Sequence, residues 1–506
     1  MKKGKVYLIG AGPGDPGLIT VKGLACLEKA DVVVYDYLAN DRLLRHIKEG
    51  AEKIYVGKKG GDHTLPQGRI NALVVEKASE GKKVARLKGG DPFIFGRGGE
   101  EAEELVRAGI PFEIVPGVTS AIAAPAYAGI PLTHRDFAST VAFITGHEDP
   151  TKEESKIDWK GISTGAGTLV FLMGVGNLSG IATELIKNGR NPETPVALIR
   201  WGTLPEQETV LGKLANIAEI ARFRNLKPPV IIVVGEVVAL REKLNWFESL
   251  PLFGKKILVT RAREQASELS GALEELGAMV IEFPTIAILP PGNWTDADHC
   301  ISQLVSYDWI IFTSPNGVKF FLERLLILGG DVRDLKGPKV CAIGPKTAES
   351  LESLKIRVDF VPREYRAEAI FEGLRKENLK GKKVLIPRAK IARDILPEEL
   401  RKAGAVVDVV EVYETVRPQE NTDEIRDLLR KRAISAITFT SSSTVGNFVE
   451  MIGQKESRGL TAGISVASIG PITAEKARSL GIETTIMPGE YTIPALVKAL
   501  ADYFKK

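Results

Sequence analysis

The sequence predicts an α/β protein built of three or four lobes, and three observations lead to this fold class. Its 506 residues exceed what one hydrophobic core usually holds. Short apolar runs alternate with amphipathic stretches, which is the pattern of parallel strands covered by helices. The second half repeats itself, since Gly254–Arg261 returns as Gly381–Arg388, so two similar lobes are expected there.

Composition and charge exclude several classes of protein. Apolar residues make up 44%, charged residues 26%, and the formal net charge is +4. We expect neither a nucleic-acid-binding tail nor a membrane span, because basic runs and apolar runs of about 18 residues are both missing from the sequence. The start, Met1–Lys5, does not resemble a signal peptide. Cys26, Cys300 and Cys341 lack metal-ligand spacing, which favours a reducing cytoplasm and no metal.

The first elements form a strand, a glycine loop and a helix, over Lys5–Ile9, Gly10–Gly17 and Leu18–Glu28. This order suggests a dinucleotide-binding motif, and hence a nucleotide-linked oxidoreductase. However, Asp15 stands where the third glycine should be, and Pro13 lacks an amide that a pyrophosphate would need. A nucleotide P-loop is excluded as well, because no Gly-Lys-Ser/Thr follows.

The next two strands, Asp31–Asp36 and Lys53–Lys58, each end on an ionisable residue. Ligands of open α/β sheets bind at the carboxyl ends of the strands. Asp36 and Lys58 are therefore expected at a site of chemistry. The alternative is that Asp36 caps the following segment and that Lys58 is a surface charge.

The stretch Arg86–Glu101 is the centre of the first half. Its four glycines let the backbone approach a ligand closely. Asp91 is placed to accept hydrogen bonds, and Arg86, Lys88 and Arg97 are expected to form a basic rim. The alternative is a solvated glycine turn.

Residues 1–247 resemble uroporphyrinogen-III C-methyltransferases. The motifs that carry the resemblance are, in order, Gly10–Asp15, Tyr35–Asp36, Val56–Lys58, Arg86–Glu101, Val115–Gly117, Pro131–Asp136, Ile144–His147, Phe171–Gly174, Trp201–Thr203 and Leu244–Phe247. The resemblance implies two α/β lobes, at about 1–115 and 118–247, with S-adenosyl-L-methionine between them. Some relatives carry an extra dinucleotide-binding module for dehydrogenation and iron insertion. Because the motifs start at the N-terminus here, we do not expect those steps.

The resemblance also implies roles for individual residues. Cofactor contacts are expected at Pro13, Gly89, Gly90, Asp91, Ile94, Thr119, Ser120, Met173 and Gly202. Asp36 is expected to accept a proton and Lys58 to donate one, because methylation of a pyrrole carbon by a sulfonium requires proton adjustments on the ring. A buried core methionine is the alternative for Met173.

The implied substrate, uroporphyrinogen III, is methylated at C-2 and C-7 to give precorrin-2. It carries eight carboxylates, for which basic side chains are suitable partners. Arg97, His134 and Arg135 are candidates, and helix caps or a core histidine are the alternatives.

Hydroxyl side chains stand at equivalent places in the two repeats of the second half. They are Thr313, Ser314, Thr347, Thr440, Ser441 and Thr473. Such groups, with amides at helix starts, can bind carboxylates, although helix capping is the alternative. His299 is the one histidine of this half, so a Cys/His nucleophile is not expected.

Residues 255–506, after a linker at 248–254, resemble uroporphyrinogen-III synthases. The matching motifs are Thr260–Arg263, Thr313–Asn316, Ile386–Arg388, Val412–Tyr413, Phe439–Ser441 and Ile469–Pro471. The resemblance implies two flavodoxin-like or Rossmann-like lobes, of 254–289 plus 416–506 and of 292–412. The hydroxyl residues above and Arg261 are then expected to bind substrate.

The implied reaction of the second half closes linear hydroxymethylbilane to uroporphyrinogen III with inversion of the last ring. This is mainly a task of holding the substrate in the right geometry. Tyr413 is expected to assist departure of the hydroxyl group, and a core tyrosine is the alternative.

Together the two halves predict a bifunctional enzyme of the siroheme or cobalamin branch, forming a homodimer through the methyltransferase half. The alternative keeps the methyltransferase and treats the second half as a non-catalytic tetrapyrrole-binding module.

Overall fold

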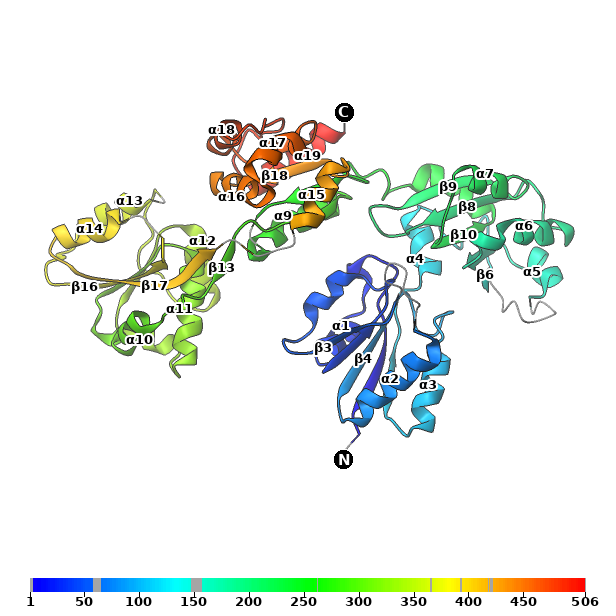
Figure 1. Ribbon diagram of the computed structural model, residues 1–506, viewed down its shortest axis with the longest axis horizontal. Helices are drawn as coiled ribbons and strands as arrows, with labels where there is room; N and C mark the ends of the chain where they lie inside the picture. The colour runs from blue at the N-terminus through cyan, green and yellow to red at the C-terminus, as the bar shows by residue number, and fades with distance from the viewer. Residues whose placement is uncertain are drawn as a thin grey trace. The chain divides into compact units, whose positions relative to one another are not determined.

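The computed structural model describes residues 3–57, 65–146, 157–261, 263–364, 366–391, 394–416, 418 and 422–505 (Figure 1). Contacts divide the chain into two compact units. The first comprises 1–256, 272–280 and 500–506, and the second comprises 257–271 and 281–499. No helix within the described ranges is long and apolar enough to cross a membrane.

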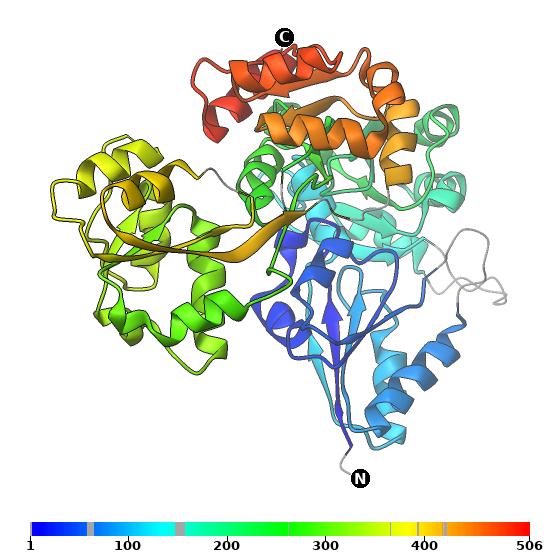
Figure 2. The same cartoon turned by 60° about the vertical axis from the view of Figure 1, so that its left-hand side comes forward.

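The first sheet is fully parallel, with strand order β3-β2-β4-β1-β5. Its strands are β1 (Lys5–Gly10), β2 (Val32–Tyr35), β3 (Glu52–Tyr55), β4 (Lys83–Lys88) and β5 (Phe112–Val115). Its helices are α1 (Val21–Leu27), α2 (Gln67–Ser79) and α3 (Gly98–Arg107). Figure 2 shows α2 in blue beside this sheet.

The two faces of this sheet have separate cores. Leu8 packs with Val74 of α2 and Leu105 of α3, whereas Ile9 packs on the other face with Leu27 of α1. Both faces are thus covered, which explains why these strands read as nearly continuous apolar runs.

One predicted helix starts later than the sequence indicated. Leu18–Glu28 was expected to be helical, but α1 begins at Val21 after a short 3-10 turn at Pro16–Leu18. The Thr20 side chain accepts a hydrogen bond from the Gly23 amide at 3.1 Å and caps the helix there.

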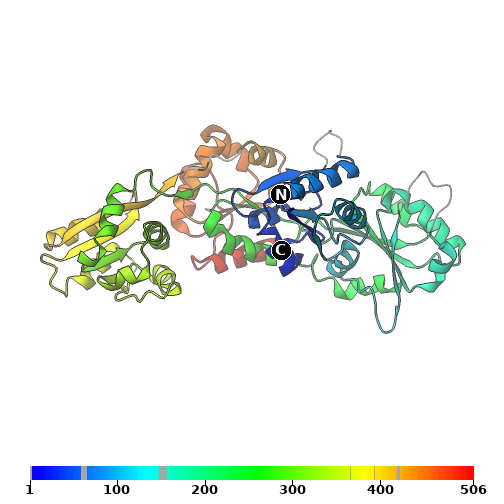
Figure 3. The same cartoon turned by 90° about the horizontal axis from the view of Figure 1, so that it is seen from below.

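The second sheet is mixed, with order β6-β7-β10-β8-β9 (teal to light green in Figure 3). Its strands are β6 (Val141–Thr145), β7 (Thr168–Leu172), β8 (Pro195–Arg200), β9 (Glu208–Lys213) and β10 (Val230–Val234). Only the β6–β7 pair is parallel among its described pairs. Its helices are α4 (Ser120–Tyr127), α5 (Trp159–Gly165), α6 (Leu178–Lys187), α7 (Ile217–Phe223) and α8 (Arg241–Leu244). Helices α6 and α7 cover one face, and the alanine-rich α4 packs closely on the other.

The second half contains two further sheets. The first has order β12-β11-β18-β19, with β11 (Lys256–Val259), β12 (Met279–Glu282), β18 (Ala436–Phe439) and β19 (Ser465–Ser468). Its helices are α9 (Arg263–Glu275), α15 (Thr422–Arg430), α16 (Ser442–Ile452), α17 (Gln454–Thr461), α18 (Pro471–Ser479) and α19 (Ile493–Phe504).

The last sheet has order β13-β17-β16-β14-β15 and is parallel except for the antiparallel β13–β17 pair. Its strands are β13 (Ala287–Leu289), β14 (Trp309–Phe312), β15 (Lys339–Ala342), β16 (Lys383–Ala389) and the long β17 (Val406–Val416), which is gold in Figure 2. Its helices are α10 (Thr295–Ser302), α11 (Pro315–Ile327), α12 (Pro345–Ser353), α13 (Ala367–Leu374) and α14 (Ile395–Lys402).

The internal repeat appears as equivalent elements in these two sheets. Strands β14 and β18 are each followed by a helix whose N-cap is a serine, Ser314 or Ser441. Strands β15 and β19 each lead into a helix that starts with proline, at Pro345 or Pro471. The expected α/β class is confirmed in both halves.

Candidate functional site

Three glycine turns meet at the carboxyl ends of β1, β4 and β5. Gly12 and Gly90 exchange backbone hydrogen bonds of 3.3 and 2.7 Å. A Cβ on Gly10 would lie 2.5 Å from the Gly117 Cα, and one on Gly117 would lie 2.4 Å from the Gly90 oxygen. No side chain fits at these contacts, so the glycines let three backbone turns touch and leave their peptide groups at the sheet edge.

Asp91 fixes the shape of the loop that follows Gly90. Its Oδ1 accepts hydrogen bonds from the amides of Phe93 (2.7 Å) and Ile94 (3.1 Å), and its Oδ2 accepts one from Gly117 (2.9 Å). One carboxylate therefore ties the β4 loop to the β5 turn. The Ile94 side chain remains 38% exposed.

The second lobe contributes the start of α4 and the loop after β8. Thr119 is the N-cap of α4, and the Cβ position of Gly90 lies 3.8 Å from both the Thr119 Cα and the Ser120 amide nitrogen. A Cβ on Gly202 would lie 2.3 Å from the Ala124 Cβ of the same helix. The structure thus brings Gly90 close to Thr119 and Ser120 at the start of α4, and Gly202 against Ala124 one turn further along the same helix.

Met173 directly follows β7 with a left-handed backbone (φ +58°), and the residue is 54% exposed. It is therefore not the core methionine of the alternative interpretation. The described contacts do not connect it directly with the glycine turns.

Hydrogen bonds across the two lobes hold the turn that contains Pro13. The Asp15 amide donates to Thr203 Oγ1 at 3.0 Å, and Tyr127 of α4 donates its hydroxyl to Asp15 Oδ2 at 2.6 Å. Burial and the neighbouring Asp15 raise the pKa of Tyr127, so it remains a donor. Asp15, Tyr127 and Thr203 form what we call the interlobe latch.

Asp36 follows β2 at the same sheet edge. Its Oδ1 accepts a hydrogen bond from the Leu38 amide (3.2 Å), and its Oδ2 accepts one from Arg86 Nη2 (3.1 Å). Oδ1 thus caps the following segment, as in the alternative interpretation, while Oδ2 is held by the Arg86 guanidinium. Lys58, its expected proton-donating partner, lies outside the described residues.

The basic rim expected from Arg86, Lys88 and Arg97 is wrong for the first two. Arg86 and Lys88 are 3% and 5% exposed, because β4 is a central strand and both side chains face Glu101 of α3. Only Arg97 lies at the surface, paired with Glu100 at 2.7 Å.

The remaining candidates of the first half lie in a turn closed by the His134–Ala138 bridge. His134 is partly exposed, and its Nδ1 accepts a hydrogen bond from the Asp136 amide at 3.2 Å. It is not a core histidine. Arg135 is exposed.

In the second half, Tyr413 and Ser314 meet. Their hydroxyl oxygens are 3.0 Å apart, and Ser314 also accepts a hydrogen bond from the Gly317 amide as the N-cap of α11. Tyr413 is 9% exposed, and its ring stacks on Phe320. The pair joins β17 to the helix start after β14.

The other hydroxyl candidates differ in exposure. Ser441 caps α16 in a capping box with Thr444, which matches the capping alternative. Thr347 and Thr473 are 2% and 4% exposed, whereas Thr313 and Thr440 are half-buried. Arg261 is half-buried, and burial lowers its pKa. Among the residues that the structure describes, no group of three His, Cys, Asp or Glu side chains is arranged to hold a metal.

Comparison with known proteins identifies both halves. A family model of tetrapyrrole (corrin/porphyrin) methylases matches residues 5–218, and a model of uroporphyrinogen-III synthase HemD matches residues 267–498. The porphyrin biosynthesis protein HemD of Ruminiclostridium josui is 40% identical over 502 residues, which is 99% of this chain and 98% of the relative. The chain belongs to this family of methylase–synthase fusions. The family that the motifs predicted for each half is confirmed.

Other relatives match the methylase half of the fusion. An S-adenosyl-L-methionine-dependent uroporphyrinogen III methyltransferase of Methanosarcina barkeri is 57% identical over 242 residues, covering 48% of this chain and 95% of the relative. A crystal structure of a uroporphyrin-III C-methyl transferase from Thermus thermophilus with S-adenyl homocysteine is 41% identical, with a TM-score of 0.40. It covers 47% of this chain and 100% of that chain.

Sequence reasoning missed several residues of the methylase half. Tyr127, Thr203 and Glu101 were not singled out, although each touches a predicted site residue or its neighbour. One signal was available for Tyr127 and Thr203. Asp15 stands where the dinucleotide motif has a glycine, two residues after Pro13, and a carboxylate in a tight loop requires hydrogen-bond donors.

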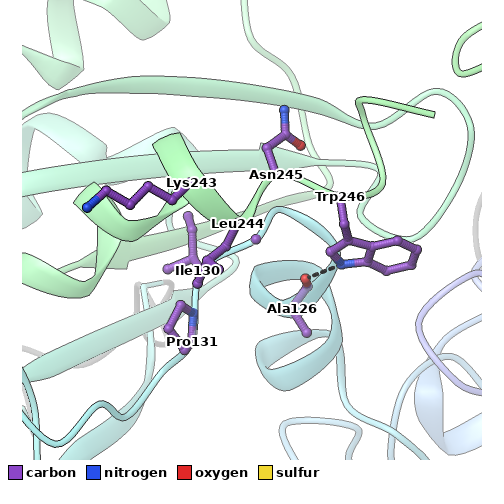
Figure 4. Close-up of a pocket in the computed structure, with 8 residues that line it drawn as sticks. Ala126, Ile130, Pro131, Lys243, Leu244, Asn245 and Trp246 are labelled. Atoms are coloured by element: carbon purple, nitrogen blue, oxygen red, sulfur yellow. Dashed lines mark hydrogen bonds between the residues drawn. The ribbon is translucent and has the colours of Figure 1, made fainter. Parts of the chain in front are cut away.

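A depression lies beside the latch, in the second lobe of the methylase half. Figure 4 shows Ala126, Ile130, Leu244 and Trp246 around it. The Trp246 indole donates to the Ala126 carbonyl at 3.0 Å, and its ring packs on Tyr127. None of the residues predicted to contact the cofactor lines this depression.

Proposed function

We propose that the chain is a bifunctional enzyme of tetrapyrrole biosynthesis. The second half converts hydroxymethylbilane to uroporphyrinogen III, and the first half methylates that product at C-2 and C-7 with S-adenosyl-L-methionine to give precorrin-2. The observation that carries the proposal is the site at the edge of the first sheet, where glycine turns and the Arg86–Asp36 pair meet in a chain whose full length matches a methylase–synthase fusion.

The residues of the first half fit S-adenosyl-L-methionine. Backbone groups around Gly90 and at the start of α4 suit the carboxylate and amine of the methionine part. The exposed thioether of Met173 offers a soft apolar surface for the adenine. In this proposal the cofactor contacts are Pro13, Gly89, Gly90, Asp91, Ile94, Thr119, Ser120, Met173 and Gly202.

The bound cofactor supplies an electrophilic methyl group, and the protein must manage the proton that the ring loses. Asp36 is the proposed acceptor, since it directly follows β2 at the site and Arg86 fixes its carboxylate. Lys58 is the proposed donor. Arg97, His134 and Arg135 are proposed to meet the carboxylates of the macrocycle, and both arginines lie at the surface.

For the synthase half we propose catalysis by holding the bilane. Tyr413 assists departure of the hydroxyl group, and its contact with Ser314 supports this role because it orients the phenol. Arg261, Thr313, Ser314, Thr347, Thr440, Ser441 and Thr473 are the proposed substrate contacts.

One experiment tests both activities. The purified chain receives hydroxymethylbilane and S-adenosyl-L-methionine, and chromatography separates the products. Uroporphyrinogen III without cofactor and precorrin-2 with cofactor are expected. Formation of isomer I at the uncatalysed rate would leave the second half as a binding module, and unmethylated uroporphyrinogen III would refute the methyltransferase assignment.

Further parts of the proposal concern organisation. The functional domains are 1–247 and 255–506, joined by 248–254, the protein is cytoplasmic, and it dimerises through the methyltransferase half. Sedimentation velocity of the whole chain and of residues 1–250 tests the dimer, which should persist in the shorter protein.

A further inference from the structure

Four charged side chains form a cluster beneath the site, which we call the buried charge cluster: Asp36, Arg86, Lys88 and Glu101. Lys88 Nζ lies 2.5 Å from Glu101 Oε1, Arg86 Nε lies 3.5 Å from the same oxygen, and Arg86 Nη2 lies 3.1 Å from Asp36 Oδ2. Arg86, Lys88 and Glu101 are 3–5% exposed, while the Asp36 side chain is 25% exposed. The cluster thus connects a buried ion pair to the one member that reaches solvent.

Such a cluster is an expensive way to stabilise a lobe. Taking an ion out of water costs several kcal/mol, which is about what a good partner returns, so apolar residues usually serve stability as well or better. The hydrogen bonding is also incomplete. Within the described structure, Arg86 Nε and Glu101 Oε2 are buried and have no hydrogen-bond partner, whereas buried polar atoms are usually satisfied. The Gln67 side-chain amide donates to Glu101 Oε1 at 2.9 Å, and so leaves Oε2 without this donor.

The geometry shows that two carboxylates share one guanidinium. Asp36 holds one edge of Arg86, and Glu101 approaches another. Lys88 neutralises Glu101 and thereby limits its pull on Arg86. Burial, followed by the charge of Arg86, lowers the pKa of Lys88, and Glu101 opposes that change.

We propose that Glu101 and Lys88 are positioning residues for methylation. Both act through Arg86: the more strongly Glu101 attracts the Arg86 guanidinium, the less firmly that guanidinium holds the Asp36 carboxylate. This inference rests on the proposed methyltransferase function and extends it to two residues that touch neither the proposed cofactor site nor Asp36 directly.

The proposal predicts opposite effects for the two partners. In Lys88→Met, Glu101 loses its cation and draws Arg86 away from Asp36. In Glu101→Gln, both cations are left with Asp36 alone. The described titratable groups that face Asp36 are Arg86 and Lys88 from β4 and the adjacent Tyr37, and Glu101 of α3 acts through the two cations.

The test is the pH profile of kcat for methylation of uroporphyrinogen III. The acidic limb should move to higher pH in Lys88→Met and to lower pH in Glu101→Gln, by about half to one unit each, as for removal of one nearby charge. Lys88→Met should also lose about tenfold in kcat, while its affinity for S-adenosyl-L-methionine in calorimetry stays within about twofold.

Matched variants separate positioning from folding. The double variant Lys88→Met/Glu101→Gln removes the pair without leaving a net charge and should return the limb to its wild-type position, and Lys88→Arg should retain that position. Glu104→Gln, which removes a half-exposed partner of Arg107 on the same helix, should leave the profile unchanged.

The proposal would be overturned if the acidic limb of the pH profile of kcat stays in place in both single variants, or moves in the same direction in both. If a single variant does not fold, the double variant and Lys88→Arg still decide, because a shifted limb in either one contradicts it. A wild-type chain that does not methylate uroporphyrinogen III would instead refute the proposed function.

Discussion

At the scale of single residues, the methylase half contains side chains that fix loops by accepting hydrogen bonds from backbone amides. Asp91 is the clearest case, since its two oxygens accept three amides from two different turns. The prediction that Asp91 accepts hydrogen bonds is confirmed. Its partners were not predictable, since the Gly117 amide comes from 26 residues further along the chain.

Replacing Asp91 with Ala should weaken binding of S-adenosyl-L-methionine by about 10- to 100-fold, because the loop loses three hydrogen bonds, each worth about 0.5–1.5 kcal/mol, and with them its shape. Synthase activity should not change. Isothermal titration calorimetry measures the affinity, and Asp136→Ala, which alters an exposed carboxylate, is the control. Unchanged affinity would show that the loop keeps its shape without Asp91.

Tyr413→Phe should lower the rate of uroporphyrinogen III formation more than tenfold, because it removes the proposed acid while keeping the ring on Phe320. Ser314→Ala should lose about 1 kcal/mol of stability with its helix cap and affect the rate less. The rate and the ratio of isomer III to isomer I give the result. Equal rates for Tyr413→Phe and wild type would return Tyr413 to a packing role.

At the scale of elements, the strands were predictable, whereas their ends and the partners of those ends were not. The strands expected to end at Asp36 and Lys58 end at Tyr35 and Tyr55. The Val32–Val34 run is apolar enough to show a buried strand, whereas Arg86 and Lys88 were expected in the glycine-rich stretch and in fact belong to β4. Whether Arg86 and Lys88 face solvent depends on which helix covers β4. The structure shows that α3 does so and that its Glu101 pairs with both side chains, which the sequence alone does not reveal. A basic residue within a central strand is better read as half of a buried pair.

The interlobe latch connects two elements, because the Tyr127 hydroxyl of α4 donates a hydrogen bond to Asp15 in the turn after β1. Tyr127→Phe should weaken S-adenosyl-L-methionine binding by about 3- to 10-fold, the usual cost of one hydrogen bond. Calorimetry measures it, and Trp246→Phe, which loses a bond within its own lobe, is the control and should bind normally. Equal affinities in Tyr127→Phe and wild type would mean that Thr203 holds the turn alone.

At the scale of the whole molecule, the repeat and the motif order were sufficient to predict two enzymes in one chain. The segment between them is more closely tied than its sequence suggests. Glu248 pairs with Arg241 and accepts hydrogen bonds from Gln207 (2.8 Å) and Thr209 (2.6 Å). Polar residues at a junction resemble a linker in sequence, and only the fold shows that Glu248 completes the second lobe of the methylase.

Cutting the chain between Leu250 and Gly254 should give two folded and separately active proteins, because Glu248 then remains with its partners. Circular dichroism and the two activity assays test this. A cut before Glu248 is the comparison and should destabilise the first fragment by about 1–3 kcal/mol, since it leaves Arg241 buried without its carboxylate. An unfolded 254–506 fragment would contradict the independence of the halves.

The backbone contacts among Gly10, Gly90 and Gly117 have a consequence for how this sequence can vary. In a library that samples all twenty amino acids at each glycine, Gly10 and Gly117 should return as glycine in every functional clone, because even alanine would place its methyl group within 2.4–2.5 Å of main-chain atoms. Gly99, in the first turn of α3 with open space around its Cβ position, should accept many replacements. The methylase half would thus contain both invariant and freely varying glycines, and lineages that diverge widely elsewhere would keep the invariant ones.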